Sequence, residues 1–364
     1  MTHIFNGIDI LEKETLYREA LEAERLGKMT NKQLAIIYQN KWFHLLVPQS
    51  MGGAEMPLPK FAKMMERLAS IDGSFAWNVN LGAGANMFAG FMEQHVASEI
   101  FKSERTCVAG SGAVMGTAKI KDEGYIISGY WKYASGSAHA NYFSLNAQLT
   151  DSETGEYASF LVPAENVKVI DTWKVFGMKA TSSCDFSISD VWIPKGYRFD
   201  LQKPSSMVHS PLYRFPFMLL AEINMLVMLN GLAIHFCELV EEFSKEKIIR
   251  DENGKQDIPL SDLLRFTMTF KKFSSAFFKN RENTFSILDK VWQETCLESE
   301  ISLDLSNRFS GSIKDTANST RELVDALYPY IGMQVVFTDT EISRVYRDFK
   351  VASQHALLYP SLRS

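Results

Sequence analysis

The sequence has few cysteines, and they form no recognised pattern. Only four occur among the 364 residues, at Cys107, Cys184, Cys237 and Cys296, and they lie 77, 53 and 59 residues apart. None belongs to a C-x-x-C pair or to another spacing typical of metal ligands. We therefore expect buried free thiols in a reducing compartment and no metal site.

A tract of basic residues is also missing. The chain has 38 lysines and arginines against 43 aspartates and glutamates, a formal net charge of -5. Proteins that bind nucleic acids need clustered cations to neutralise phosphates. We therefore expect no nucleic-acid partner.

No apolar run is long and uninterrupted. The first twenty residues contain charges where a signal peptide needs a continuous apolar stretch. The most apolar segment, residues 215–236, contains Glu222, Asn224 and Asn230, each of which would be costly in lipid. These features predict a cytoplasmic protein without a membrane association, in which this segment is a buried helix.

The spacing of apolar residues divides the chain into three zones. Residues 1–105 space apolar side chains by three and four, which predicts a helical domain. Residues 106–200 change toward a period of two, which predicts an antiparallel β domain, either a sheet or a small barrel. Residues 201–364 return to helical spacing and predict a helical bundle of the four-helix type. The expected fold class is therefore α+β, in the order helix domain, β domain, helix bundle.

Four local stretches point to one superfamily. They are KWFHLLVPQSMGGAEM (41–56), CVAGSGAVMGTAKI (107–120), GYIISGYWKYASGSAHANYF (124–143) and DTWKVFGMKATSSCDFSISDVWIP (171–194). In this order, and with the three zones, they resemble the acyl-CoA dehydrogenase superfamily of flavoproteins over essentially the whole chain. Within the third stretch, SGYWKYASGSAHA (128–140) is similar to the oxygenase components of two-component flavin monooxygenases, whereas dehydrogenases proper carry K-x-W-I-T there.

The third stretch supplies candidate flavin contacts. An isoalloxazine ring needs apolar faces to cover it and hydrogen-bond partners along its edge. Because alternate residues of a strand point to one side, Trp131, Tyr133 and Ser135 are expected to share a face, although alternating aromatic residues also form cores. The resemblance implies that the Ser135 hydroxyl reaches the flavin. It also implies contacts from the side chains of Trp173, Thr181, Ser182 and Ser183 and from backbone N–H groups at Val108, Ala109 and Ser111.

Three further features leave alternatives open. His139 either acts in catalysis or anchors the turn after its strand, because histidine titrates near neutral pH. Arg214 either faces the ligand entrance or caps a helix. Ala180 and Ser182 stand where the superfamily has glycine, which restricts the backbone at these positions.

The C-terminal stretch RVYRDFKVASQH (344–355) carries the candidate catalytic residue. In much of the superfamily a catalytic glutamate follows an R-D pair by eight residues, but here that position is Ala356 and no Glu-Gly follows. The stretch resembles the monooxygenase pattern that ends in a histidine, which implies that His355 assists proton transfer beside the flavin. We also expect Asp348 and His355 to share a helix face, and Arg347 and Asp348 to form an ion pair.

The resemblance leaves three functions. The leading interpretation is a monooxygenase that uses reduced FMN or FAD and oxygen on a small apolar or aromatic substrate. The alternative is an FAD-dependent acyl-CoA dehydrogenase in which Glu222, with a pKa raised by burial, is an atypical base. The third is a flavin-binding relative with impaired catalysis, because the helical segment 77–87 lacks the histidine that related hydroxylases often place near the substrate.

The cofactor pattern favours a diffusible flavin. Dehydrogenases that hold FAD permanently carry Q-x-x-G-G-x-G-Y and R-x-x-F-G segments, whereas this chain has only YPYIGMQVVF (328–337). The resemblance therefore implies reduced flavin delivered by a separate, transiently bound reductase. It also implies a homotetramer, although the residues alone allow a dimer.

Overall fold

The computed structural model describes residues 10–151, 155–206, 208–297 and 300–359. The helices are α1 (Ile10–Leu26), α2 (Asn31–Gln39), α3 (Leu58–Ala69), α4 (Gly73–Asn86), α5 (Gln94–Ile100), α6 (Phe217–Glu246), α7 (Leu264–Cys296), α8 (Leu303–Ile331) and α9 (Glu341–Ala352). The strands are β1 (Val108–Lys121), β2 (Gly124–Ala134), β3 (Tyr142–Leu149), β4 (Tyr157–Pro163), β5 (Lys168–Ile170), β6 (Cys184–Pro194), β7 (Arg198–Phe199), β8 (Ile248–Arg250) and β9 (Asp257–Pro259). The helix, sheet, helix order is the one predicted from the apolar periods, and the α+β fold class is confirmed.

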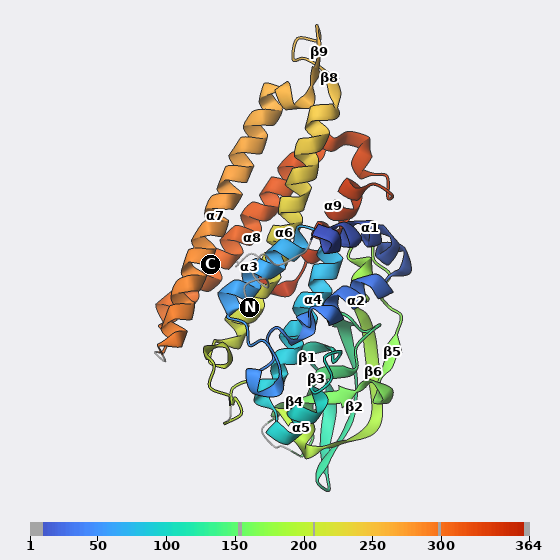
Figure 1. Cartoon of the computed structure of the whole chain (residues 1–364), viewed down its shortest axis with the longest axis vertical. Coiled ribbons are helices and arrows are strands. Elements are labelled where there is room, and N and C mark those ends of the chain that lie inside the picture. Colours follow the sequence, from blue (N-terminus) through green and yellow to red (C-terminus); the bar gives the residue numbers. More distant parts are fainter. Residues whose placement is uncertain (1–9, 152–154, 207, 298–299, 360–364) are drawn as a thin grey trace.

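The N-terminal helices begin at side chains that cap them. Thr30 and Gln33 form a capping box at α2, and the Asp72 carboxylate accepts a hydrogen bond from the Phe75 N–H at α4. The small residues of α4 let its neighbours approach closely. Figure 1 shows α4 between the long helices and the sheet, so this helix joins the two halves of the molecule.

The sheet has seven strands in the order β5-β6-β2-β1-β3-β4-β7. All its pairs are antiparallel except β1 and β3, which run parallel. The prediction of an antiparallel sheet is therefore wrong for this pair, because the chain passes from β2 across β1 before it forms β3. The sheet has its own apolar core, separate from the larger core of the helices.

Helices α6, α7, α8 and α9 form the C-terminal bundle (Figure 1). Helix α6 is long and apolar enough to cross a membrane, but 78% of its most apolar window is buried inside the fold, as expected of a core helix. The polar loop between α6 and α7 contains the small hairpin of β8 and β9. The domain limits at residues 105 and 200 remain a prediction.

The cysteines are free thiols, as predicted. Cys107, Cys184 and Cys237 are buried, but Cys296 is exposed at the end of α7, so the expectation of burial is wrong for this residue.

A buried ion pair fastens α3 to the bundle. The Glu66 carboxylate accepts hydrogen bonds from Arg281 Nε at 2.9 and 3.0 Å and from Asn230 Nδ2 at 2.9 Å. The Glu66 side chain is only 5% exposed. A carboxylate in this position depends on its cation, because burial without a partner is strongly unfavourable.

Replacing Arg281 by Leu tests this dependence. The Glu66 charge would remain buried without its cation, so the free energy of unfolding in urea should fall by about 3 kcal/mol or more. Arg308→Leu is the matched control, because Arg308 pairs with Asp304 on the exposed face of α8 and should cost at most about 1 kcal/mol. Equal losses in the two variants would contradict a special role for the Glu66 pair.

Candidate functional site

A break in strand β2 separates the side chains that were expected to share a face. The β2–β6 register shifts between Trp131 and Ala134, and Tyr133 has a left-handed backbone with φ 67°. Trp131 is fully buried in the sheet core, where it stacks on Phe186. The prediction that Trp131 lines the ligand site is therefore wrong, whereas Tyr133 is 66% exposed and presents its ring outward.

Ser135 belongs to a continuous chain of hydrogen bonds. Trp77 Nε1 of α4 donates to Ser135 Oγ at 3.1 Å, and Ser135 Oγ lies 2.7 Å from Ser183 Oγ. Ser183 Oγ lies 2.7 Å from Thr181 Oγ1, which donates to the Met178 carbonyl at 2.8 Å. We call this series, from Trp77 to Met178, the hydroxyl chain. It brings together three of the predicted residues, Ser135, Thr181 and Ser183.

All hydrogen bonds of the hydroxyl chain donate in the same direction, from Trp77 toward Met178. Each hydroxyl has one proton, the Trp77 indole can only donate, and the Met178 carbonyl can only accept. Every contact therefore holds a proton only if Ser135 donates to Ser183 and Ser183 donates to Thr181. Ser135 is then an acceptor toward any ligand, because its own proton is already used.

The backbone N–H and carbonyl of Met178 connect the sheet domain to the C-terminal bundle. Its carbonyl also accepts a hydrogen bond from Trp173 Nε1 at 3.0 Å, and its N–H donates to the Asp348 carboxylate of α9. Ser74 Oγ of α4 lies 3.4 Å from Asp348 Oδ2. Met178 itself has a left-handed φ of 53°, a conformation that side chains disfavour and that these bonds hold in place.

Asp348 is buried and is paired differently from the prediction. Burial raises the pKa of Asp348 to about 7, and the nearby Arg344 guanidinium opposes this shift. Arg347 does not pair with Asp348: it pairs with Glu24 of α1 and donates to the Phe176 carbonyl at 2.7 Å. The predicted Arg347–Asp348 ion pair is therefore wrong, because adjacent helix residues point to different sides.

His355 lies beyond the helix that was expected to contain it. Helix α9 ends at Ala352, and His355 is the N-cap of a short 3₁₀ turn, Ala356–Leu358. The expectation that His355 shares a helix face with Asp348 is therefore wrong. Arg321 of α8 holds the segment by donating to the carbonyls of Ser353 at 2.7 Å and Leu358 at 2.8 Å.

The His355 ring nevertheless reaches the hydroxyl chain. Its centroid lies 6.0 Å from that of Trp77, edge to face. Burial lowers the pKa of His355, so the ring is neutral at pH values above its usual 6.5. The Leu357 N–H points at Nδ1 from 3.4 Å, which favours the tautomer with its proton on Nε2.

Ser182 occupies a position that suits glycine. Its φ of 45° is left-handed, which explains why the superfamily has glycine there and why a side chain is strained. The Ser182 carbonyl accepts a hydrogen bond from Ser137 Oγ at 2.6 Å, and this bond helps to hold the strained peptide. Ala180 shows no such conformation.

A cavity of about 680 Å³ adjoins the hydroxyl chain. Its volume lies within the usual range for small-molecule sites. Trp173, whose ring meets Tyr133 at 6.3 Å, lines it. The other lining residues include the cations Arg25, Lys174 and Lys179, the acids Glu24, Asp171 and Asp339, and Ser182 and Cys184. Lys174 pairs with Asp171, and Lys179 pairs with Glu24. The aromatic and polar groups suit a flavin ring, while the acids balance the cations of this lining.

The remaining predicted residues lie outside this arrangement or at its edge. The Val108 N–H bonds Asn86 Oδ1 at 3.0 Å and Ala109 is buried in the sheet core, so the predicted backbone cradle is wrong at Val108. Ser111 is half-buried where the β1–β3 register shifts. Arg214 donates to the carbonyls of His209 and Thr295, the latter at the end of α7, as a helix cap would.

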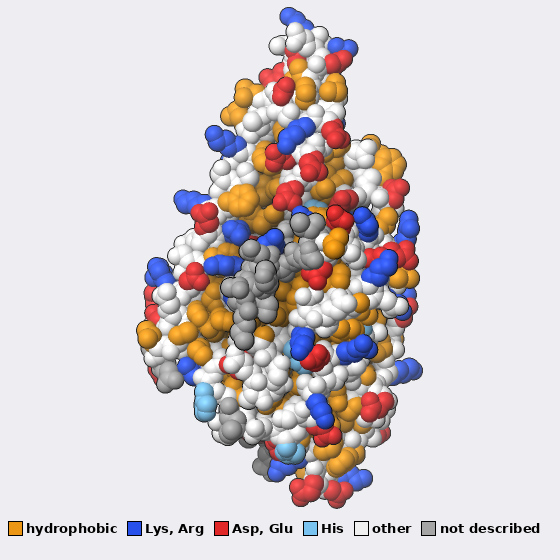
Figure 2. All heavy atoms as spheres, in the orientation of Figure 1, with side chains coloured by type: hydrophobic (Ala, Val, Ile, Leu, Met, Phe, Trp, Pro, Cys, Tyr) orange, Lys and Arg blue, Asp and Glu red, His pale blue; other side chains and the backbone are white. Residues whose placement is uncertain are grey.

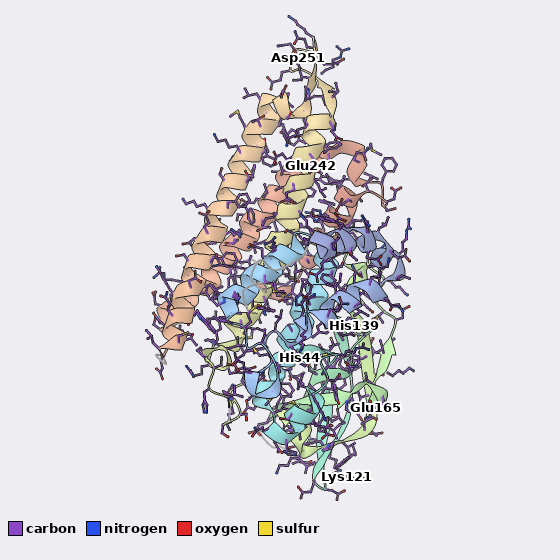
Figure 3. All side chains as sticks on the ribbon, in the orientation of Figure 1. His44, Lys121, His139, Glu165, Glu242 and Asp251 are labelled. Carbon is purple, nitrogen blue, oxygen red and sulfur yellow. The ribbon has the colours of Figure 1, made fainter. Side chains whose placement is uncertain are left out.

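His139 and Glu222 are the two other titratable residues that the sequence offered as candidates for catalysis. His139 stacks on Phe43 at 5.7 Å, and burial lowers its pKa to about 4, as expected of the anchoring alternative (Figure 3 labels His139 where the N-terminal helices meet the sheet). Glu222 is half-buried on α6, and its Oε2 has no hydrogen-bond partner among the described residues.

Sequence reasoning missed Trp77 and Met178. Trp77 lies in an apolar helix where an aromatic residue indicates only packing, and Met178 acts through its backbone, which leaves no trace in residue type. The tryptophan's burial beside a strand motif is visible only once α4 is placed against β2.

Replacing Asp348 by Asn tests the state of this carboxyl. The pKa of Asp348 is raised from its usual 3.8 to about 7. Between these two pH values, Asp348 keeps a proton in the folded protein that the unfolded chain has released. Wild-type stability should therefore fall as the pH rises through this window, by up to about 1.4 kcal/mol per pH unit, and the Asn variant should lack this fall. Urea unfolding of both proteins across the window measures the difference.

The matched control is Asp289→Asn, at a partly exposed position of α7 where Asp289 lies 3.9 Å from Lys63. The free energy of unfolding of this variant should change with pH as that of the wild type does. If the free energies of unfolding of the wild type and Asp348→Asn differ by the same amount at every pH in the window, Asp348 is ionised in the folded state.

Comparisons with known proteins identify relatives of the whole chain. No known protein-family profile matches the sequence. The chain is 24% identical over 319 residues to an indole-3-acetate monooxygenase of Acinetobacter baumannii, which covers 87% of this chain and 80% of that protein. It is 25% identical over 211 residues, 56% of this chain and 55% of the other, to the flavin-dependent monooxygenase oxygenase subunit HsaA of Rhodococcus jostii.

Solved structures of monooxygenases share the fold. XiaF from a Streptomyces species, in complex with FADH2 and glycerol, matches with a TM-score of 0.85 at 22% identity, over 95% of this chain and 89% of that one. The chain therefore has the acyl-CoA dehydrogenase-like fold, and its sequence relatives include oxygenase subunits of flavin-dependent monooxygenases.

Proposed function

We propose that the protein is the oxygenase component of a flavin-dependent monooxygenase, which uses reduced flavin and oxygen to hydroxylate a small apolar or aromatic substrate. The observation that carries the proposal is the one-way hydroxyl chain, which presents Ser135 as an acceptor beside Trp77 and His355. The names and activities of the relatives support the same reaction class.

The direction of the hydroxyl chain suits a reduced flavin. Flavin N5 carries a hydrogen in the reduced state and is a bare acceptor in the oxidised state. Ser135 has a lone pair to offer but no proton, so it matches the N–H of the reduced form. A bound reduced flavin supplies the electrons that activate oxygen.

Other residues have distinct roles toward this cofactor. Tyr133 and Trp173 offer ring faces. Arg25, Lys174 and Lys179 line the cavity, and a phosphate would take Lys174 and Lys179 from their present partners Asp171 and Glu24. FMN and FAD both carry such a phosphate group. We propose that either is taken up in reduced form from a separate, transiently bound reductase.

His355 is the proton-handling residue of this proposal. It stands seven residues past Asp348, one residue before the position at which a dehydrogenase would keep its glutamate, and it is neutral at pH 7. A neutral imidazole with a proton on Nε2 can donate a hydrogen bond to an oxygen atom, and after it takes up a proton it can deliver one as a general acid and return to the neutral form.

We also propose that the protein is cytoplasmic and assembles as a homotetramer, or else a dimer, through its long helices. Helix α7 exposes Leu264, Met268 and Phe278, which water disfavours. Figure 2 shows apolar side chains between charged ones on the visible face of the long helices.

Stopped-flow mixing with oxygen tests the reaction class. Protein with reduced FMN or FAD should form an oxygen-dependent absorbing species that free reduced flavin does not show. Its decay should change below about pH 6.5 as His355 takes up a proton. His355→Gln should bind flavin equally well but lose this pH dependence.

His95→Gln is the matched control, because His95 is exposed on α5. Its kinetics should equal those of the wild type. Reoxidation of bound flavin at the same rate and in one phase, as for free flavin, would contradict the proposed function.

Thr181→Val tests the preference for the reduced cofactor. Without the Thr181 hydroxyl, Ser183 can turn its proton to Ser135, whose own proton is then free to reach an oxidised N5. The ratio of the two dissociation constants, oxidised over reduced, should fall about tenfold. Anaerobic and aerobic flavin titrations measure it.

Thr284→Val is the matched control for this substitution. Thr284 is equally buried but lies on α7, where it bonds Ser312 and Thr316. The ratio should not change there. An unchanged ratio in Thr181→Val would show that the hydroxyl chain does not set the preference.

A further inference from the structure

Strand β2 contains a bulge directly before the serine of the hydroxyl chain. The β2–β6 register shifts between Trp131 and Ala134. As a result, Lys132 and Tyr133 of β2 both lie opposite Asp185 of β6. A bulge of this two-to-one kind disrupts the ladder locally and redirects the side chains beside it, so something else must hold the strand in place.

The Asp185 carboxylate bonds both flanks of this bulge. Its Oδ1 accepts a hydrogen bond from the Tyr133 N–H at 3.2 Å, and its Oδ2 accepts one from the Tyr130 hydroxyl at 2.5 Å. The second bond raises the pKa of the Tyr130 phenol above its usual 10. Asp185 is only 7% exposed, so water offers its oxygens few other partners. These bonds hold Tyr133 in its left-handed conformation, with φ 67°.

The turn that follows the bulge carries Ser135. The Tyr133 carbonyl accepts a hydrogen bond from the Ser135 N–H at 3.0 Å, and the Thr181 carbonyl accepts one from the Gly136 N–H at 2.8 Å. The backbone around Ser135 is therefore fixed by Tyr133 on one side and by Thr181 on the other. A displacement of Tyr133 would move the Ser135 hydroxyl away from its partners in the hydroxyl chain.

Asp185 also reaches the second aromatic group of the cavity. Its N–H donates to Thr172 Oγ1 at 3.0 Å, and Thr172 directly precedes Trp173. The rings of Trp173 and Tyr133 meet edge to face at 6.3 Å. One residue of β6 is thus bonded to both segments that carry these rings.

We infer that Asp185 is a positioning residue, whose carboxylate fixes the β2 bulge and through it the ring of Tyr133 and the acceptor oxygen of Ser135. The inference rests on the proposed function, because that function assigns both groups to the reduced flavin. A carboxylate suits this position because it supplies two acceptor oxygens, one for each flank of the bulge. Asp185 acts through Tyr133 and Ser135 and not by contact with the flavin.

Three substitutions separate the acceptor oxygens of Asp185 from its charge and its size. Asp185→Leu removes both acceptors, and Asp185→Ala does the same with a smaller side chain, which covers the case in which the Leu variant does not fold. Asp185→Asn keeps an oxygen for the Tyr133 N–H, and its Nδ2 can donate to the Tyr130 oxygen. The Leu and Ala variants should therefore behave alike, whereas the Asn variant should resemble the wild type.

Hydrogen–deuterium exchange of the full-length protein without flavin measures whether the bulge is held. The amides of Tyr133 and Ser135 should exchange about tenfold faster in Asp185→Leu and Asp185→Ala, because the bond that protects the Tyr133 N–H is lost. They should exchange at the wild-type rate in Asp185→Asn. Unchanged exchange in the Leu and Ala variants would overturn the inference.

Anaerobic and aerobic titrations with FMN measure the consequence for the ligand. The ratio of the dissociation constants, oxidised over reduced, should fall about tenfold in Asp185→Leu and Asp185→Ala and keep its wild-type value in Asp185→Asn. A ratio that stays the same although exchange is faster would show that the bulge does not position Ser135, and would overturn the inference. Absence of flavin binding by the wild type would instead contradict the proposed function, while the exchange rates would still decide whether Asp185 fixes the bulge.

Asp190→Leu is the matched control. Asp190 is an exposed residue of the same strand at a second irregularity of the β2–β6 ladder, where it has φ 52° and forms hydrogen bonds of 2.8 and 2.9 Å with Ser128. Its loss should leave the exchange of Tyr133 and Ser135 and the ratio of the flavin dissociation constants unchanged. Equal effects of Asp190→Leu and Asp185→Leu would show a general weakening of the sheet and would overturn the inference.

Discussion

The Met178 peptide is the constraint on which the rest of the site depends. Its N–H is held by Asp348 from the C-terminal bundle, and its carbonyl holds Trp173 and Thr181 from the sheet domain. Ser74 of the N-terminal helices touches the same carboxyl. All three zones of the chain therefore meet around the backbone of one residue, and the hydroxyl chain has its direction only because the Met178 carbonyl ends it.

Such a site cannot form before the zones have docked. Met178 and Ser182 both have left-handed backbones, and each is stable only because nearby groups bond the strained peptide. The surroundings are equally demanding, since Asp348 is buried within reach of Arg344, Asp72 and Glu24. Packing of the large cores supplies the stabilisation that strain and charge burial oppose. The site is thus a consequence of complete folding.

Sequence reasoning recovered what depends on residue type and spacing. The period change marks the sheet, and the stretches around Ser135 and at residues 180–183 identify hydroxyls that the structure brings together. It was wrong where local geometry interrupts a period: the β2 register shift turns Trp131 inward and Tyr133 outward. It was wrong again at His355, because α9 ends at Ala352. The role of Met178 could not be predicted, since any residue supplies a backbone N–H and carbonyl.

The charges around α9 explain why an imidazole suits the position near its end. Arg344 lies 3.9 Å from Asp72 and 3.6 Å from Glu341, and it also faces Asp348. Arg347 already forms an ion pair with Glu24. A further carboxylate at the end of α9 would share these cations with several acids, and burial would force it to hold a proton. A neutral histidine needs no counter-ion, so His355 can lie against Trp77 and still exchange a proton, which a glutamate could do there only by giving up its charge.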